Sequence, residues 1–319
     1  MDLSIIIVNW NSKDYLKKCI ELILCHTHDI NFEIIVIDSA SYDGCGEMLR
    51  QVYPCVQFVQ NHQNLGFAKA NNKAFQFSKG KSLLFLNPDT EVEDNSIVVL
   101  YKHLNSLPDA GIVGARLLNS DRSIQTSCIQ SFPDILNQVL DMEVLRKRFP
   151  RWKLWGMSSL IDNVSKPSEV ESVSGACLMI KREVFEKVGM FSNDFFMYSE
   201  DIDLCFKVRK RGLKNFYIPD AIVVHHGGTS SAQSNVSTFS SVMQVESQCR
   251  FFRKTRSETY CYQYRLALFA SSVIRLAFLF PALHLYKKRG ETHWIQGAIQ
   301  KWEARLRWTL GLERWSKKY

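Results

Sequence analysis

The sequence predicts an α/β protein with a mostly parallel central sheet and helices on both faces. Four short apolar runs, at residues 4–8, 33–37, 56–59 and 83–86, lie within the first 90 residues. The first, second and fourth are continuous rather than alternating, which is typical of strands buried on both faces. Helical patterns separate the runs, and such a strand–helix alternation builds a parallel sheet through crossover connections.

Each helix between these strands has its own signal. Ser12 is the expected N-cap of a first helix to about residue 25, in which Leu16, Cys19 and Ile23 follow at helical spacing. A short helix around 47–49 and a longer one over 68–78 precede the third and fourth strands. Pro88 ends the fourth strand because it cannot donate to a sheet ladder.

Beyond residue 110 the alternation is looser. Residues 111–115 predict a strand, and residues 170–180 predict another with Gly175 in its middle, where a ligand or another backbone would approach closely. Helices are expected over 181–188 and 200–211, and a short strand-like segment at 215–218; residues 222–224 precede the block at His225. Residues 119–170 have no clear pattern and contain a basic-aromatic patch at 146–153.

Composition indicates an ordinary globular protein, with 46% hydrophobic and 23% charged residues in a chain of 319. The nine cysteines include no C-x-x-C pair, which favours a reducing compartment with neither a zinc site nor a disulfide framework. The N-terminus lacks the basic flank of a signal peptide, so we expect a cytoplasmic catalytic face.

Charge divides the chain. Residues 246–319 carry 15 Lys and Arg against 5 Asp and Glu, whereas residues 1–245 carry 25 against 27. We therefore expect a catalytic domain over 1–245, with a nucleotide-binding half at about 1–118 and an acceptor half at about 119–245. A basic, amphipathic helical region follows over 246–319. A basic tail suits nucleic acid or an anionic membrane surface.

The tail favours a membrane. Residues 266–286 are apolar over nearly the length of a membrane span, but Arg275 lies in the middle and Pro281 should break the helix. The cations at 287–289 and four tryptophans beyond residue 290 suit a membrane interface. We expect a monotopic helix or hairpin on the inner face of the cell membrane, without nucleic acid. The alternative is a helix packed on the domain or on a second subunit, as in a homodimer.

Polar residues stand where the predicted strands end. Asn9 and Asn11 follow the first strand, Asp38 closes the second, and Asn87-Pro88-Asp89 follows the fourth. In the last of these groups, an Asp beside an Asn at the end of a buried strand lies where open α/β sheets bind ligands. Oxygen atoms of Asp and Asn suit Mg²⁺ or Mn²⁺ bridging a diphosphate. The alternative for the last group is an Asn-Pro turn that caps the next helix.

Seven short blocks in this order resemble the family 2 glycosyltransferases of GT-A fold, especially the branch with bacterial rhamnosyltransferases. They span roughly residues 3–231, at residues 8–11, 36–44, 64–68, 85–89, 174–176, 200–204 and 225–228. Each block is weak alone, and their order makes the resemblance specific. It implies the GT-A (nucleotide-diphospho-sugar transferase) fold, to which the helical membrane-associating tail expected from the C-terminal residues is added.

The resemblance implies how a nucleotide-sugar is bound. The residue that matches Asp38 binds the base in the family, while Ser39 stands where relatives often have Asn. The implied donor-binding residues are Asn9, Asn11, Asp38, Ser39, Asn64, Gly66, Asn87, Asp89 and Gly175. The alternative for Asp38 is an Asx-turn that caps a loop.

It also implies a metal site and a catalytic base. Asn87-Pro88-Asp89 matches the family's D-x-D metal motif, so Asp89 is the principal ligand of Mg²⁺ or Mn²⁺. His225, rather than His226, completes the site, and Gly227 and Gly228 let backbone N–H groups approach phosphate. Asn87, an uncharged ligand, is expected at the ribose or an outer-shell water.

Glu200 and Asp201 match the acidic pair that contains the base. Asp201 is the expected proton acceptor, with Glu200 the substitute. The alternative is that these carboxylates only complement the helix dipole.

The function expected is an inverting glycosyltransferase that acts in cell-surface polysaccharide synthesis. It would move rhamnose from dTDP-rhamnose to a hydroxyl of a glycan or polyprenyl-linked glycan. The alternatives are a UDP-hexose-dependent transferase of the same fold and a catalytically silent membrane-bound assembly module. A Rossmann oxidoreductase or a sugar nucleotidyltransferase would need a glycine-rich loop after the first strand, where Asn9-Trp10-Asn11 stands.

Overall fold

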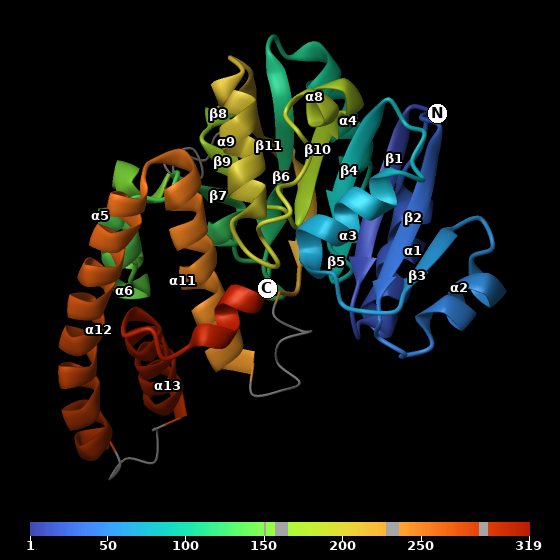
Figure 1. Ribbon diagram of the computed structural model, residues 1–319. Coiled ribbons are helices and arrows are strands. Elements are labelled where there is room, and N and C mark those ends of the chain that lie inside the picture. Colours follow the sequence, from blue (N-terminus) through green and yellow to red (C-terminus); the bar gives the residue numbers. More distant parts are fainter. Residues whose placement is uncertain (150, 157–164, 228–235, 287–292) are drawn as a thin grey trace. The chain divides into compact units, whose positions relative to one another are not determined.

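The computed structural model describes the chain except residues 150, 157–164, 228–235 and 287–292 (Figure 1). Its internal contacts divide it into two compact units. The first comprises Met1–Phe132, Arg146–Phe196 and Glu200–Ser230, and the second Pro133–Leu145, Met197–Ser199 and Ser231–Tyr319. Every predicted site residue lies in the first unit. The second contains the basic C-terminal region, and the expected boundary at residue 245 stays a prediction.

The first unit is built on a nine-stranded mixed sheet in the order β3-β2-β1-β4-β10-β6-β11-β5, with β8 also paired to β11. Strands β1 to β4 are parallel to one another, and β10 runs antiparallel between β4 and β6. The strands are β1 Leu3–Asn9, β2 Phe32–Ser39, β3 Gln57–Asn61, β4 Ser82–Leu86, β5 Thr90–Val92, β6 Ala110–Leu118, β8 Ser168–Val170, β10 Cys177–Lys181 and β11 Lys214–His225. A separate pair joins β7 Ile129–Gln130 to β9 Ser172–Val173.

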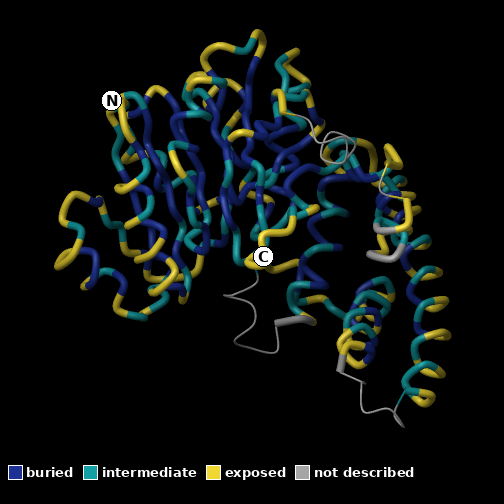
Figure 2. The backbone as a smooth tube through the Cα atoms, turned by 180° about the vertical axis from the view of Figure 1, so that it is seen from behind, coloured by how far each residue is buried: buried dark blue, intermediate teal, exposed yellow. Residues whose placement is uncertain are grey.

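The four predicted N-terminal strands are confirmed, and they hold the core. All five residues of β4 are buried, and β1 is buried from Leu3 to Ile7 (Figure 2). Helices pack on both faces of the sheet, as predicted: α3 on β1 and β2, α4 on β6 and β11, and α9 on β9 and β11 (Figure 1). Among its described residues, this unit contains the helices α1 Lys13–His26, α2 Cys45–Val52, α3 Gly66–Phe75, α4 Ser96–Ser106, α8 Arg182–Lys187 and α9 Glu200–Lys210.

The structure corrects two strand predictions. The strand expected over 170–180 is three short strands, β8, β9 and β10, and Gly175 lies in the turn between β9 and β10. The expected strand is interrupted because β9 pairs with β7 in a separate two-stranded sheet. The short strand expected at 215–218 is part of a longer one, β11, which extends to His225 and whose register with β6 shifts between Ile218 and Ile222.

The second unit is helical. It contains α5 Ile135–Val139, α11 Val236–Thr255, α12 Glu258–Tyr286 and α13 His293–Thr309, while α6 Glu143–Arg148 crosses from this unit into the first. Helix α12 packs on α11, α13 and α5. A disulfide joins Cys249 on α11 to Cys261 on α12, a pairing that the sequence did not predict. The cysteine count does not show that two helices bring these sulfur atoms together.

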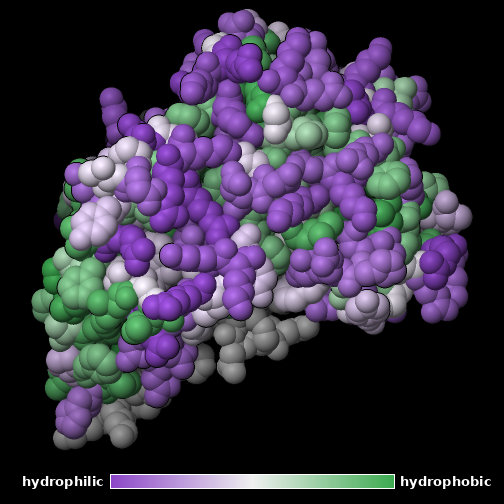
Figure 3. All heavy atoms as spheres, viewed as in Figure 1, coloured by the Kyte–Doolittle hydropathy of each residue, from purple (hydrophilic) through white to green (hydrophobic). Residues whose placement is uncertain are grey.

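Helix α12 is long and apolar enough to cross a membrane, and 17% of its most apolar stretch is buried. The prediction that Pro281 breaks it was wrong, since the helix continues through this residue to Tyr286. Arg275 is accommodated within the unit: it donates to Val139 O at 2.6 Å and lies 4.2 Å from the ring centroid of Trp302. Exposed apolar side chains gather over α12 (Figure 3), including Leu266, Phe269, Val273, Ile274, Phe278, Phe280 and Leu285.

Candidate active site

Asp38 lies at the end of β2, opposite Asn9 in the parallel register with β1. It is fully buried, and Asn9 Nδ2 donates to its Oδ1 at 2.8 Å. Ser41 N and Gln60 Nε2 donate to its Oδ2 at 2.9 and 2.7 Å. Burial acts to raise the pKa of Asp38, but hydrogen bonds from Ser41, Asn9 and Gln60 outweigh it and hold this pKa below its ordinary value. The side chain is therefore a fixed anion.

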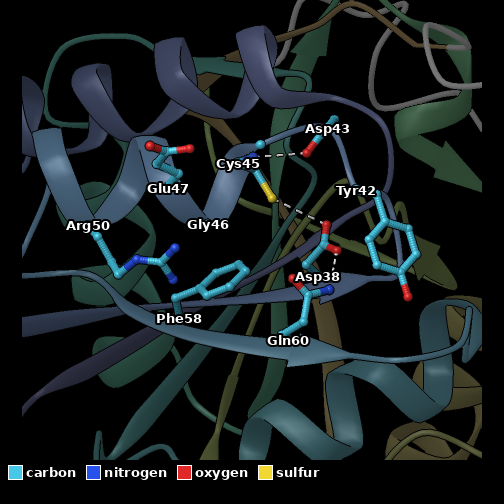
Figure 4. A pocket seen from close by; sticks show the side chains of 10 residues that line it. Asp38, Tyr42, Asp43, Cys45, Gly46, Glu47, Arg50, Phe58 and Gln60 are labelled. Atoms are coloured by element: carbon cyan, nitrogen blue, oxygen red, sulfur yellow. Dashed lines mark hydrogen bonds between the residues drawn. The ribbon is translucent and has the colours of Figure 1, made fainter.

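A pocket of about 280 Å³ opens beside this carboxylate. Figure 4 shows Asp38 and Gln60 pointing toward each other, with Phe58 and Arg50 on the side of α2. Tyr42, which also lines the pocket, is 79% exposed. An aromatic ring beside a buried anion is suited to a flat, polar ring with N–H donors.

Within the described residues, Asp38, Asp43 and Cys45 form a cluster whose potential ligand atoms lie within 4.8 Å of one another. Cys45 Sγ donates to Asp38 Oδ1 at 3.4 Å. Burial and the nearby charge of Asp38 raise the pKa of this thiol. Since the thiolate is the form that binds metals, the cluster does not fit a cation.

The other residues predicted near the nucleotide occupy the loops of the same sheet edge. Asn11 has a positive φ of 51° and its N–H donates to Ser41 Oγ, while Ser39 is buried at the end of β2. Asn64 Oδ1 accepts from Gly66 N at 2.9 Å, at the start of α3. A Cβ on Gly66 would meet Phe196 O at 2.2 Å, so only glycine fits there.

Asn87, Asp89 and His225 form a second group. Strand β11 pairs antiparallel with β5, with His225 opposite Thr90, and this pairing brings the ring to the Asn-Pro-Asp turn. His225 Nε2 lies 3.4 Å from Asp89 Oδ1 and 3.2 Å from Asn87 Nδ2. His226, one residue on, instead contacts Glu91 Oε1 at 3.0 Å.

This second group fits a divalent cation. Asp89 Oδ1 and His225 Nε2 are close enough to share one ion, and a carboxylate with an imidazole suits Mn²⁺. Two protein ligands leave positions open for the oxygen atoms of a diphosphate. Gly228, expected at the phosphate, lies outside the described residues.

Gly175, Glu200 and Asp201 form a third group. Asp201 Oδ2 accepts from Gly175 N at 2.8 Å, and its Oδ1 accepts from Ile202 N at 2.8 Å. A Cβ on Gly175 would lie 3.2 Å from Asp201 Cβ, so glycine lets the turn approach this carboxylate. The third acid of the helix start, Asp203, accepts from Ser192 Oγ and pairs with Lys207. Asp203 therefore has a structural role that Asp201 does not share.

The two neighbouring carboxyls differ in their surroundings. Glu200 is 7% exposed, and its Oε2 has no hydrogen-bond partner in the described chain. Burial, and then the charge of Asp201, raise the pKa of Glu200 to about 8. Burial also raises the pKa of Asp201, but the N–H groups of Gly175 and Ile202 oppose that shift by stabilising its ionised form. Of the two carboxyls, Asp201 is therefore the one whose ionised form has hydrogen-bond donors, while Glu200 keeps its proton to about pH 8.

A backbone hydrogen bond connects the second group to the third. Asn87 N donates to Ala176 O at 3.0 Å, one residue after Gly175. This contact follows from the antiparallel pairing of β10 with β4, in which Cys177 lies opposite Leu86. The turn that carries Gly175 thus touches both the Asn-Pro-Asp turn and Asp201.

Three residues of the site have no role predicted from the sequence. Ser41 and Gln60 hold Asp38, and Gln125 Oε1 lies 2.8 Å from His225 Nδ1. Ser41 lies inside a motif block, and Gln60 follows the third apolar run at its carboxyl end, so both had a signal. Gln125 lies in the stretch without a clear pattern and had none.

Comparison with known families identifies the relationship. The family model described as Glycosyl transferase family 2 matches residues 4–189. A second, described as Glycosyl transferase family group 2, matches residues 141–317. The first match covers all the predicted site residues except Glu200, Asp201 and His225.

Two relatives are rhamnosyltransferases by name. The N-acetylglucosaminyl-diphospho-decaprenol L-rhamnosyltransferase of Mycobacterium tuberculosis is 29% identical over 217 residues, covering 64% of this chain and 69% of that protein. Rhamnosyltransferase WbbL of Escherichia coli is 24% identical over 234 residues, covering 70% and 82%.

The mannosyltransferase PcManGT from Pyrobaculum calidifontis, solved in complex with GDP-Man and Mn²⁺, has a similar fold. Its TM-score is 0.59 at 17% identity, over 97% of this chain and 86% of that one. At this identity the likeness speaks for the fold, and the predicted GT-A fold is confirmed.

Proposed function

The chain belongs to glycosyl transferase family 2, and from that premise we propose that it is an inverting rhamnosyltransferase. Its donor is dTDP-rhamnose, and its acceptor is a hydroxyl of a lipid-linked glycan in cell-surface polysaccharide synthesis. The observation that carries the chemistry is the environment of Asp201. Its carboxylate is held by two backbone N–H groups, while the neighbouring Glu200 is kept neutral by burial.

Inverting transfer needs one proton acceptor on the side of the acceptor. The acceptor hydroxyl oxygen attacks C1 of the sugar, the bond from C1 to the diphosphate oxygen breaks, and the hydroxyl proton passes to Asp201. The nucleoside diphosphate leaves with the bonding electrons. Asp201 is suited to this role because two backbone N–H groups stabilise its ionised form, whereas Glu200, the substitute, lacks a comparable set of donors.

Asp38 and the pocket beside it would hold the nucleotide base, together with Asn9, Asn11 and Ser39. Asn64, Gly66 and Gly175 would line the donor site, with Asn87 at the ribose. Asp89 and His225 would hold Mg²⁺ or Mn²⁺, and the donor set of one carboxylate and one imidazole favours Mn²⁺. When bound, the ion supplies positive charge to the departing diphosphate.

The donor sugar rests on the names of two relatives, both rhamnosyltransferases. One of those names also specifies a decaprenol diphosphate carrier, which supports a polyprenyl-linked acceptor. The exposed apolar side chains of α12 and the basic C-terminal region support attachment to the inner, anionic face of the cell membrane, where such a carrier is reached.

The first test is a binding and turnover panel. The full chain is incubated with dTDP-rhamnose, UDP-glucose, UDP-N-acetylglucosamine or GDP-mannose, with Mn²⁺ or Mg²⁺, and thermal shift and release of nucleoside diphosphate are measured. We expect dTDP-rhamnose with Mn²⁺ to give the largest effect. A larger effect of a UDP-sugar would show that the donor is a UDP-sugar and not dTDP-rhamnose. If no sugar is turned over with an extract of lipid-linked acceptors, the alternative of a catalytically silent assembly module would be favoured.

The second test separates chemistry from binding. Asp201→Asn should lower kcat by about 10²–10⁴-fold because the proton acceptor is lost, while the Kd of the donor changes little. Asp220→Asn, an exposed acid on β11, is the matched control and should behave as wild type. A variant whose main defect is donor affinity would move the base assignment to Glu200.

A further inference from the structure

Gln125 is the polar contact of His225 on the side of the ring opposite Asp89. His225 Nδ1 lies 2.8 Å from Gln125 Oε1, while Nε2 faces Asp89 Oδ1 and Asn87 Nδ2. The two ring nitrogens thus face different groups. Which of them carries the proton of the neutral imidazole depends on these neighbours.

The orientation of the Gln125 amide is set by its own partners. Its Nε2 donates to Asn119 Oδ1 at 3.1 Å and to the backbone oxygen of His225 at 3.3 Å. Asn119 is held in turn, because its Nδ2 donates to Ser123 Oγ at 2.9 Å. With its N–H groups used in this way, Gln125 can present only an oxygen to His225, and an oxygen accepts a proton from Nδ1.

Asn87 favours the same tautomer from the other side. Its Nδ2 is a donor 3.2 Å from His225 Nε2, so it needs an unprotonated nitrogen there. Asp89 opposes this arrangement, since its Oδ1 at 3.4 Å would accept a proton from Nε2. Removing Gln125 would leave that proton free to move from Nδ1 to the face of the ring that a cation needs.

We propose that Gln125 is a positioning residue that holds His225 in the Nδ1–H tautomer with its Nε2 lone pair directed at Asp89. The proposal deepens the function proposed above and rests on it, because it assigns Nε2 to the ligand set of the divalent cation. A histidine that binds a metal generally needs a partner on its other nitrogen, and losing that partner costs about 10–100-fold in metal affinity. Gln125 supplies the partner here from the loop that follows β6.

The test uses two substitutions of the full chain. Gln125→Met keeps the length of the side chain and removes both the acceptor and the donors. Gln125→Glu keeps an acceptor toward Nδ1 and serves as the rescue variant. Gln130→Met is the matched control, since Gln130 lies on β7 and donates to Ser127 O instead.

The first readout needs neither metal nor substrate. Nitrogen-15 chemical shifts of the histidine rings are recorded at alkaline pH, where the imidazoles are neutral, and His225→Ala identifies the His225 signals. Wild type, Gln125→Glu and Gln130→Met should show a protonated Nδ1 and an unprotonated Nε2. Gln125→Met should shift toward protonated Nε2. An unchanged tautomer in Gln125→Met overturns the proposal.

The second readout is the affinity for Mn²⁺ alone, measured from the free-ion signal in electron paramagnetic resonance. Gln125→Met should bind about 10–100-fold more weakly, and Gln125→Glu should bind as wild type or more tightly. Equal affinity in Gln125→Met, despite a changed tautomer, also overturns the proposal. His225→Ala distinguishes failure of this proposal from failure of the proposed function: unchanged Mn²⁺ binding in that variant would refute His225 as a metal ligand. The tautomer and the Mn²⁺ affinity are both measured without a sugar donor, so they do not depend on whether the protein turns over dTDP-rhamnose.

Discussion

Glu200→Gln tests whether burial keeps this carboxyl neutral beside the base. Glu200 is 7% exposed at the start of α9, and its Oε2 has no hydrogen-bond partner in the described residues. Burial and the charge of Asp201 raise its pKa from an ordinary value of 4.5 to about 8. The substitution keeps the shape of the side chain and removes the titration.

The sign of the effect follows from proton linkage. In the unfolded chain Glu200 loses its proton near pH 4.5, whereas in the folded chain it keeps it to about pH 8. Between these values the folded state binds more protons, so the free energy of unfolding falls as the pH rises. The contribution is fully present below pH 4.5 and is lost by the time the pH has risen through about 8. The slope is about 1.4 kcal/mol per pH unit, and the whole interval amounts to on the order of 4 kcal/mol, shared with Asp201.

The assay is the free energy of unfolding of wild type and Glu200→Gln between about pH 5 and pH 8. Because the two units need not unfold together, stability is followed by denaturant-dependent hydrogen exchange in peptides of α9 and β10, corrected for intrinsic exchange. In the variant, the free energy of unfolding should fall less steeply with pH than in wild type, by up to about 1.4 kcal/mol per pH unit. The glutamine amide leaves a buried group unpaired at about 1–3 kcal/mol, but this cost is the same at every pH.

Glu186→Gln, an exposed glutamate on α8, is the matched control and should change neither slope nor offset. Parallel curves for wild type and Glu200→Gln would refute the reasoning. The carboxyl would then titrate as in the unfolded chain, and the assignment of the ionised base to Asp201 alone would lose its basis.

Three further predictions follow from single features. Gly66→Ala should destabilise the protein by about 3 kcal/mol or more in denaturant unfolding, since it combines a positive φ with a contact at 2.2 Å. The control Gly189→Ala, at a glycine with a similar φ but open space around it, should cost only about 1–2 kcal/mol. Equal losses in the two variants would contradict the steric explanation. Asp38→Asn should weaken nucleoside diphosphate binding by at least about tenfold in calorimetry, or ~1.4 kcal/mol, because the fixed anion is lost; unchanged affinity would remove Asp38 from the base site. The double variant Ile274→Glu/Phe278→Glu should no longer sediment with anionic vesicles, since each buried charge costs about 2–3 kcal/mol in a membrane. The control Leu24→Glu on α1 should sediment as wild type. Sedimentation of the double variant with the vesicles would refute membrane attachment through α12.

Local patterns in the sequence were sufficient for the part of the sheet from β1 to β4. Three of its parallel strands, β1, β2 and β4, have continuous apolar runs because both of their faces are covered, and Pro88 marks the end of β4. Where such strands are parallel, their carboxyl ends share one edge, so the sequence alone predicts that polar residues at these ends lie close together. Asn87 and Asp89 were predicted in this way, whereas the roles of Asn9 and Asp38 came from the family resemblance.

Contacts between segments far apart in the chain decided the rest. His225 reaches Asp89 only because β11 pairs with β5, a three-residue strand whose sequence has no strand signal of its own. Gln125 reaches His225 across 100 residues, and Cys249 reaches Cys261 through the packing of two helices. The motif blocks named both Glu200 and Asp201, but the choice between them depends on how each is buried and which backbone N–H groups face it. Hydrophobic periodicity reports which side of an element is covered, and it carries no information about which distant element covers it; that information exists only once the chain has folded.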